Sequence, residues 1–272
     1  MAALGEIAEQ LGKKDWNLNL NHCDENFNWY TPIVPTRISN STVNCNCSSA
    51  DECHISAIIL KGQDLSGVLP RSIVKLPYLK IIDLSRNYLR GSLPPEWAST
   101  KLEYMYLSMN RISGTIPKFL GSITSLTNVS FESNMFNGTV PAELGNLVDL
   151  LYLNFNSNNL TGELPKEFSN LINLRELLSS NNFNGKLPSF QSCKQLRILE
   201  LEASGFEGPI PSDISLLRNL TEIRITDLNG GASEFPKLEN MTALEKLMLR
   251  NCNISGTIPV YLASFPLKVL GT

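Results

Sequence analysis

The sequence predicts an α/β repeat solenoid in which short strands stack into a concave parallel β-sheet and the chain winds as a right-handed superhelix. One pattern of apolar residues returns along most of the chain, with onsets mostly 24 residues apart. A period of this size is typical of solenoids, because each unit buries its apolar face only against its neighbours. Many units also end in Gly, any residue, a branched aliphatic residue and Pro, which is typical of a turn.

The pattern is clearest in residues 79–94, LKIIDLSRNYLRGSLP, which form a leucine-rich repeat. Alternate residues of a strand face opposite sides of a sheet, so the first, fourth and sixth positions can present one apolar face. The ninth position is Asn, which can bond backbone groups of a tight turn that a dry interior would leave without partners. The frame begins at Ile55, Leu79, Leu102, Leu126, Leu150, Leu174, Leu196, Leu220 and Leu244, and the ladder asparagines include Asn87, Asn110, Asn134 and Asn158.

The segments that return between strands begin with a glycine, which supplies an easy turn, and a proline, which fixes φ. We therefore expect the convex side to consist of turns rather than helices. The turn glycines are Gly91, Gly114, Gly138, Gly162, Gly208 and Gly256.

The chain divides into an N-terminal cap, residues 1–54, and a solenoid, residues 55–272, with nine repeats and the start of a tenth. Residues 2–14 are expected to form a short amphipathic helix that ends at Gly12 and covers the first repeat. Its apolar residues are Leu4, Ile7, Ala8 and Leu11. The last residues, LKVLGT, begin another strand with no C-terminal cap, so we expect an exposed strand edge there and a fragment or a shortened gene product.

Four of the six cysteines fall within the cap, in a stretch rich in Asn, Ser and Thr. Four cysteines allow three pairings, and two residues that are two apart in an extended chain share a face, so each pairs more easily with a third residue. The favoured pairs are Cys23 with Cys45 and Cys47 with Cys53. A zinc site with His22 or His54 is the alternative, but the spacing lacks the CxxC and HxxxH pairs of closed structural sites.

The sixth repeat is one residue shorter than its neighbours before its glycine, which leaves two possible registers. One register buries Ser179, whereas the other turns Glu176 inward. An unpaired buried carboxylate costs several kcal/mol, while Ser in a Leu position costs roughly 2–3 kcal/mol. The expected buried residues are therefore Leu174 and Leu177, and the expected ladder residue is Asn181 or Asn182.

The eighth repeat lacks both the ladder Asn and the glycine turn, which are replaced by ITDLNGGASEFP. Gly230 and Gly231 indicate a reshaped convex loop, and we expect the ladder to be interrupted there. Cys193 and Cys252 are expected to be unpaired buried thiols, with Cys252 at a ladder position.

Composition excludes several classes of protein. The net charge of −3 and the pI near 5.6 predict no binding to nucleic acid. No apolar run approaches the roughly 18 residues that span a bilayer, and residues 2–11 do not resemble a signal peptide, so the chain as given is expected to be soluble. Eight Asn-x-Ser/Thr sequons favour an exported setting and are candidate glycosylation sites: Asn40, Asn46, Asn128, Asn137, Asn159, Asn219, Asn240 and Asn253.

No motif indicates an enzyme. The two histidines both lie in the cap, neither GxSxG nor GxxxxGK occurs, and no carboxylate pair is singled out by its spacing. We therefore expect no catalytic residue, cofactor or metal in this chain.

Three segments carry a resemblance to a known family: KGQDLSGVLP, DLSRNYLRGSLPPEW and ITDLNGGASEFPKLENMTALEKLMLRNCNISGTIP. They resemble the extracellular region of plant leucine-rich-repeat receptor-like serine/threonine kinases, and most closely the subfamily that continues through a malectin-like domain, a transmembrane helix and a kinase. The resemblance implies a binding module at the extracellular face of the plasma membrane that perceives a peptide, glycan or partner ectodomain. The alternative is a secreted inhibitor of cell-wall hydrolases, or a decoy form of the receptor.

The ligand is expected on the concave sheet, because side chains of the third, fifth and seventh positions project outward there. Tyrosines and opposed charges are common at binding surfaces, although tyrosines also suit any pleated surface and charges also pair across strands. The candidates are an aromatic group, Tyr104, Tyr106 and Tyr152, and a charged group, Glu200, Glu202, Glu222, Arg224, Lys246 and Arg250. A glycan on Asn128 would lie between the tyrosines.

Overall fold

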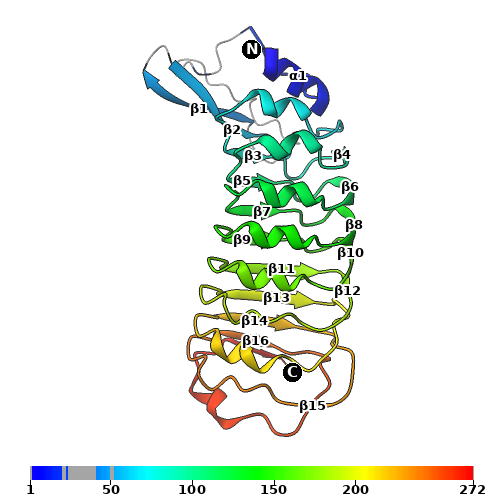
Figure 1. Ribbon diagram of the computed structural model, residues 1–272, viewed down its shortest axis with the longest axis vertical. Helices are drawn as coiled ribbons and strands as arrows, with labels where there is room; N and C mark the ends of the chain where they lie inside the picture. The colour runs from blue at the N-terminus through cyan, green and yellow to red at the C-terminus, as the bar shows by residue number, and fades with distance from the viewer. Residues whose placement is uncertain (1, 20–22, 24–40, 50–51, 272) are drawn as a thin grey trace.

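A computed structural model describes residues 2–19, 23, 41–49 and 52–271. Figure 1 shows an elongated stack of repeats, with helix α1 (Ala2–Leu11) at one end and the last strands at the other. The predicted solenoid with its parallel sheet is confirmed. Asn40 and His22 lie outside the described residues.

The large sheet has 11 strands in the order β1-β2-β3-β5-β7-β9-β11-β13-β14-β16-β18. Strands β1 and β2 pair in an antiparallel hairpin, and the later pairs are parallel. The strands are β1 (Thr42–Ser49), β2 (Glu52–Ile59), β3 (Ile81–Asp83), β5 (Tyr104–Tyr106), β7 (Asn128–Ser130), β9 (Tyr152–Asn154), β11 (Glu176–Ser180), β13 (Ile198–Glu202), β14 (Glu222–Ile225), β16 (Lys246–Met248) and β18 (Val269–Gly271).

One column of apolar side chains crosses the large sheet and points into the core, where one residue of each strand stacks on its neighbours. Its buried members are Ile58, Ile82, Met105, Val129, Leu153, Leu177, Leu199, Ile223 and Leu247. The residues on either side of this column point the other way, and we call the face that they form the open face.

Two smaller sheets lie in the return half of the repeats. The first has the order β12-β10-β8-β6-β4, and the second pairs β15 with β17. Their strands are β4 (Arg90–Gly91), β6 (Arg111–Thr115), β8 (Met135–Thr139), β10 (Asn159–Gly162), β12 (Asn182–Phe183), β15 (Ser233–Glu234) and β17 (Ile254–Ser255). Four of these strands contain or end at a glycine with φ between 73° and 86°, a conformation that a side chain disfavours.

The returns also carry short 3-10 helices, so the prediction of turns without helices was wrong. In each, the proline is extended, and the amide three residues later donates to the proline carbonyl, as Trp97 does to Pro94 at 3.1 Å. This single tight turn carries an apolar residue inward and then ends. The helices are η1 (Arg71–Lys75), η2 (Pro95–Ser99), η3 (Lys118–Ser122), η4 (Ala142–Asn146), η5 (Lys166–Asn170), η6 (Ser212–Leu216) and η7 (Val260–Ser264).

The predicted asparagine ladder is confirmed, and Asn110 illustrates it. Its amide nitrogen donates to the carbonyls of Leu84 and Leu107 at 3.0 Å and of Ser108 at 3.2 Å. Its amide oxygen accepts from the Leu89 backbone N–H at 3.0 Å. Each ladder Asn therefore satisfies its own turn and also the turn of the preceding repeat.

The sixth repeat takes the predicted register. Leu174 and Leu177 are fully buried, whereas Glu176 lies on the open face and is half-buried. Ser179 is also fully buried, and its hydroxyl accepts a hydrogen bond from the Asn181 amide at 3.3 Å. Asn181 is the ladder residue, since its amide also bonds the Phe155 carbonyl of the preceding repeat at 2.8 Å.

The eighth repeat replaces the ladder Asn with the buried Leu228, as expected. In the ninth repeat the Cys252 thiol lies 3.1 Å from the Ile225 carbonyl, the position that a ladder amide would bond. Cys193 and Cys252 are both free and buried, as predicted. Burial raises the pKa of each thiol to about 11, so both remain protonated at neutral pH.

The cap covers the first repeat through α1. Leu4, Ile7, Ala8 and Leu11 are buried, as predicted, and Gly12 ends the helix with φ of 74°. The Lys13 ammonium is buried, lies 2.9 Å from the Asp15 carboxylate and donates to the Gln63 amide oxygen at 2.9 Å. The predicted disulfides are confirmed: Cys23 pairs with Cys45, and Cys47 with Cys53.

Replacing Asn110 with Ala should leave backbone groups of two turns without hydrogen-bond partners in the dry interior. We expect the free energy of unfolding to fall by about 1–3 kcal/mol, the usual cost of buried polar groups without partners. Urea unfolding followed by circular dichroism measures it. The exposed Asn184 is the matched control, and its change to Ala should stay within about 0.5 kcal/mol. Equal effects of the two substitutions would contradict the ladder's role.

Gly145 lies where η4 and η5 pack closely. A Cβ atom on Gly145 would lie 2.5 Å from the Glu167 carbonyl oxygen, which belongs to the backbone and cannot swing away. Gly145→Ala should therefore destabilise the chain by about 1–3 kcal/mol in urea unfolding. At Gly231 no heavy atom lies within 4 Å of an added Cβ, so Gly231→Ala should be neutral or slightly stabilising. If Gly145→Ala left the free energy of unfolding unchanged, η4 and η5 would be able to move apart without loss of stability, which would contradict the prediction.

Candidate functional site

The predicted tyrosines lie on neighbouring strands of the open face. Tyr104, Asn128 and Tyr152 are in register on β5, β7 and β9, so each flanks the next across the sheet. Tyr106 stands two residues along β5 from Tyr104, and the two ring centroids are 6.2 Å apart. The parallel register therefore gathers three tyrosines around one asparagine.

A hollow of about 520 Å³ lies over these strands on the open face. Its wall and floor mix two tyrosine rings, two cationic side chains and three carboxylates with smaller polar groups. The lining residues are Lys61, Asp83, Ser85, Arg86, Tyr106, Ser108, Met109, Asn128, Ser130, Glu132, Tyr152 and Glu176. Such a mixture can stack on a ring or an apolar side chain and hydrogen-bond polar groups around it.

The two tyrosine hydroxyls in the hollow are held in their protonated form. Burial raises the pKa of Tyr106, and Tyr104, Tyr152 and Asp83 add to the rise, while a hydrogen bond from Asn128 opposes it. Burial likewise raises the pKa of Tyr152, helped by nearby Glu132. Each hydroxyl can therefore donate a hydrogen bond to a ligand.

The floor beneath the rings is a preorganised polar network. The Asn154 amide donates to the Tyr152 hydroxyl at 3.0 Å and to the Glu132 carboxylate at 3.3 Å. The Ser108 and Ser130 hydroxyls lie 2.6 Å apart and bond to each other. These contacts restrict the side chains before a ligand arrives, which lowers the entropy lost on binding.

The members of the predicted aromatic group lie differently relative to the hollow. Tyr106 and Tyr152 line the hollow, whereas Tyr104 packs beside Tyr106 and is not part of the lining. Sequence reasoning missed the charged residues around the rings: Lys61, Asp83, Arg86, Glu132 and Glu176. Their only signal was their place in the repeat: Lys61, Asp83, Glu132 and Glu176 occupy third, fifth or seventh positions, whereas Arg86 is at an eighth position and had no such signal.

The predicted charged group is also brought together, but its members bind one another. Arg224 lies 2.5 Å from Glu222, 3.4 Å from Glu200 and 3.6 Å from Glu202. Lys246 contacts Glu222 at 2.8 Å. The charges thus pair along and across strands β13, β14 and β16. Arg250, the sixth predicted member, is exposed, and its charge acts on Asp227 instead.

Two carboxyl groups of the network titrate in opposite directions. Burial raises the pKa of Glu200, assisted by neighbouring Glu222 and opposed by Arg224. Burial also acts to raise the pKa of Glu222, but hydrogen bonds from Lys246 and Arg224 outweigh it, so that its pKa is lowered. As the pH falls, Glu200 therefore takes up a proton before Glu222, and Glu222 keeps its charge and its two cationic partners to lower pH.

The described sequons differ in exposure. Asn128 is half-buried in the hollow, whereas the other described sequon asparagines are exposed. Asn137 and Asn159 pair across β8 and β10 of the five-stranded sheet in the return half of the repeats, away from the open face. The exposed sequon asparagines are Asn46, Asn137, Asn159, Asn219, Asn240 and Asn253.

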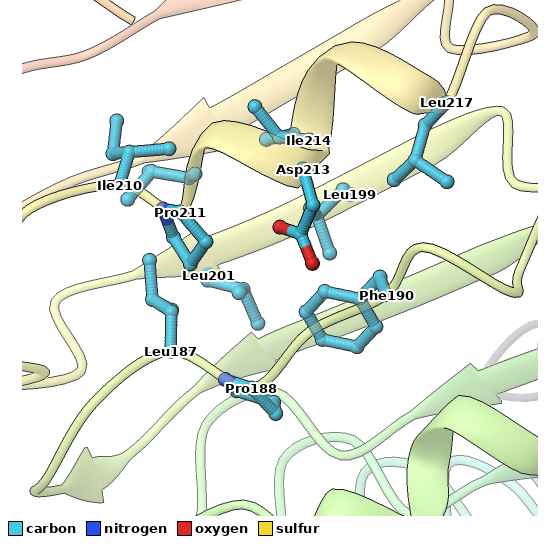
Figure 2. Close-up of a pocket in the computed structure, with 11 residues that line it drawn as sticks. Leu187, Pro188, Phe190, Leu199, Leu201, Ile210, Pro211, Asp213, Ile214 and Leu217 are labelled. Atoms are coloured by element: carbon cyan, nitrogen blue, oxygen red, sulfur yellow. The ribbon is translucent and has the colours of Figure 1, made fainter.

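A second space lies inside the core near η6, where Figure 2 shows apolar side chains around the Asp213 carboxylate. That carboxylate accepts a hydrogen bond from the Ser189 hydroxyl. The volume is about 10 Å³, which holds roughly one water. This space is therefore a packing defect rather than a ligand site.

Within the described ranges, no three His, Cys, Asp or Glu residues are grouped so as to hold a metal ion. The same residues include no helix with the length and apolar character needed to cross a membrane.

The fold is a repeat solenoid with a hollow on its open face. A family profile described as leucine-rich repeat region matches residues 53–267. The chain therefore belongs to the leucine-rich repeat family.

The relatives are plant receptor kinases, which confirms the resemblance seen in the sequence. A probable LRR receptor-like serine/threonine-protein kinase of Arabidopsis thaliana is 41% identical over 268 residues, which cover 96% of this chain and 26% of that kinase. The chain spans between 12% and 26% of the length of the first curated relatives that it matches. The malectin-like domain of the predicted subfamily stays a prediction.

Two solved ectodomains are similar in fold. The plant peptide hormone receptor RGFR1, solved in complex with RGF2, has a TM-score of 0.71 and 30% identity over 75% of this chain and 34% of that one. The Arabidopsis receptor kinase HAESA, solved with the peptide hormone IDA and the co-receptor SERK1, has a TM-score of 0.66 and 25% identity over 84% of this chain and 43% of that one.

Glu222→Gln tests the charged network. The pKa of Glu222 lies below its ordinary value of 4.5 in the folded chain, so its stabilisation is present above pH 4.5 and is lost as pH falls through the folded-state pKa. We expect the variant to be less stable at pH 7 by about 1–3 kcal/mol, because two cations lose a charged partner. The difference from the unaltered chain should shrink below pH 4.5 in urea unfolding at a series of pH values.

Glu245 provides the matched control, since its carboxylate pairs with Lys268 at 2.6 Å at an exposed site. Glu245→Gln should change stability by no more than about 1 kcal/mol, the usual value of a surface ion pair. A Glu222→Gln variant with a constant stability difference from pH 7 to pH 3 would contradict the assignment.

Proposed function

We propose that this chain is the extracellular ligand-binding region of a plant receptor-like kinase. It holds a peptide, glycan or partner ectodomain on the open face and performs no catalysis itself. The observation that carries the proposal is the hollow of β5, β7 and β9, where two protonated tyrosines stand over a preorganised polar floor. The relatives support the proposal, because they are named receptor-like kinases and the region matched here is the repeat region.

Within this proposal, a peptide is the ligand that fits best. The two similar ectodomains were solved with peptide hormones. The hollow also suits a short chain segment, because cationic Lys61 and Arg86 and acidic Glu132 and Glu176 can each meet a charge of opposite sign. The charged network of β13, β14 and β16 is the weaker candidate, because a ligand would first have to displace its internal ion pairs.

The double variant Tyr106→Ala/Tyr152→Ala tests the hollow as the anchor. Peptides that bind the purified chain would be selected from a random synthetic library, and their affinities measured by isothermal titration calorimetry. We expect the variant to bind them at least about 30-fold more weakly, since central aromatic anchors contribute about 2 kcal/mol or more.

Tyr88→Ala is the matched control, because Tyr88 is an exposed tyrosine outside the open face and its loss should leave affinity unchanged. The earlier pair, Tyr104→Ala/Tyr106→Ala, should lose less affinity than the variant that removes both lining rings. Full affinity in a folded Tyr106→Ala/Tyr152→Ala variant would exclude the hollow and favour the charged network.

A further inference from the structure

The sequon asparagine Asn128 lies at the centre of the binding hollow, unlike the other described sequon asparagines. Its strand, β7, runs between β5 and β9, and its side chain stands in register between Tyr104 and Tyr152. Asn128 lines the hollow and is half-buried there. A group attached to its amide nitrogen would begin inside the hollow.

The hydrogen bonds of Asn128 set the direction of such a group. Its amide oxygen accepts from the Thr127 hydroxyl at 3.0 Å. The amide nitrogen, which is the atom that an N-linked glycan modifies, takes no part in this hydrogen bond. Because Asn128, Tyr106 and Tyr152 line the same hollow, the first sugar would lie within reach of both rings. A pyranose ring has an apolar C–H face that can pack on an aromatic ring.

We propose that Asn128 carries an N-linked glycan whose first sugars pack against Tyr106 and Tyr152 and close the hollow. A chain that carries this glycan has a covered hollow, whereas a chain without it keeps the hollow open. The proportion of the two forms sets how many chains can bind a ligand there. The inference rests on the proposed function, because N-glycosylation requires export through the secretory pathway.

The third residue of the sequon determines when the modification occurs. Ser130 is 4% exposed, and its hydroxyl bonds that of Ser108. A transferase that must read both Asn128 and Ser130 cannot reach the second residue in the folded repeat. The modification therefore precedes folding of the fourth repeat. The fraction of chains that are modified is decided by the competition between glycosylation and folding during synthesis.

The chain offers an internal measurement of this closure. Trypsin, which cuts after Lys and Arg, releases residues 119–166 as one peptide. This peptide contains Asn128, the sequons Asn137 and Asn159 of β8 and β10, and Tyr152 as its one tyrosine. The full chain would be secreted from a eukaryotic host, nitrated briefly in the folded state with tetranitromethane, digested and analysed by mass spectrometry. Glycan position and tyrosine nitration are then read on the same peptide.

We expect a glycan on Asn128 and severalfold lower nitration of Tyr152 in the peptides that carry it. Glycans on Asn137 or Asn159 should leave Tyr152 nitration unchanged, because these asparagines lie on β8 and β10, away from the open face. Where Asn128 is fully occupied, the Asn128→Gln and Ser130→Ala variants supply the unmodified reference. Tyr88, exposed outside the open face, should be nitrated equally in all forms.

An unmodified Asn128 in the secreted chain would overturn the inference, and so would a modified Asn128 with unprotected Tyr152. Either result leaves the proposed function standing, because that proposal is tested by the loss of peptide affinity in the Tyr106→Ala/Tyr152→Ala variant. Failure of the proposed function would instead appear as full peptide affinity in the Tyr106→Ala/Tyr152→Ala variant, whether or not Asn128 carries a glycan.

Discussion

The structure depends on how backbone groups in the tight turns are satisfied away from water. A single repeat cannot hydrogen-bond all of these groups by itself, because its strand is short, its turn is shielded from water, and its carbonyls and amides point toward the next repeat. Asn110 resolves the problem in both directions, since one amide bonds three carbonyls and accepts one N–H across two repeats. Every repeat therefore needs its neighbour, and the parallel register that aligns the open face follows from this need.

The departures from the ladder show how much variation this constraint allows. In the sixth repeat a buried Ser179 is tolerated because the ladder amide of Asn181 bonds its hydroxyl. In the ninth repeat the thiol of Cys252 approaches the carbonyl that an amide would bond. At the start of the solenoid, Gln63 holds the ladder position and accepts from buried Lys13 of the cap. The first and ninth repeats thus keep a polar group at the ladder position without asparagine, whereas the eighth repeat has the buried Leu228 there.

The same regular register produces two surfaces of opposite character on the open face. On β13, β14 and β16, charges of both signs fall within contact distance and pair, so the surface is largely satisfied by itself. On β5, β7 and β9, rings and amides surround a hollow. The pKa values of Tyr106 and Tyr152 are raised there, so both tyrosine hydroxyls remain hydrogen-bond donors. Binding is favoured where little internal pairing must be broken, which directs the proposed ligand site to the hollow.

The sequence by itself determined the repeat, the buried apolar column and the ladder, because each depends on spacing along the chain. For the disulfides it favoured one of three pairings, and the structure decided between them. It also decided the register of the sixth repeat, since only one register keeps the Glu176 carboxylate out of the core. Tertiary structure decided the rest: the 3-10 form of the returns, the mutual pairing of the predicted charges, and the separation of Tyr104 from the lining of the hollow. These features depend on side-chain directions and distances between repeats, such as the 2.5 Å from Arg224 to Glu222, which spacing along one chain does not specify.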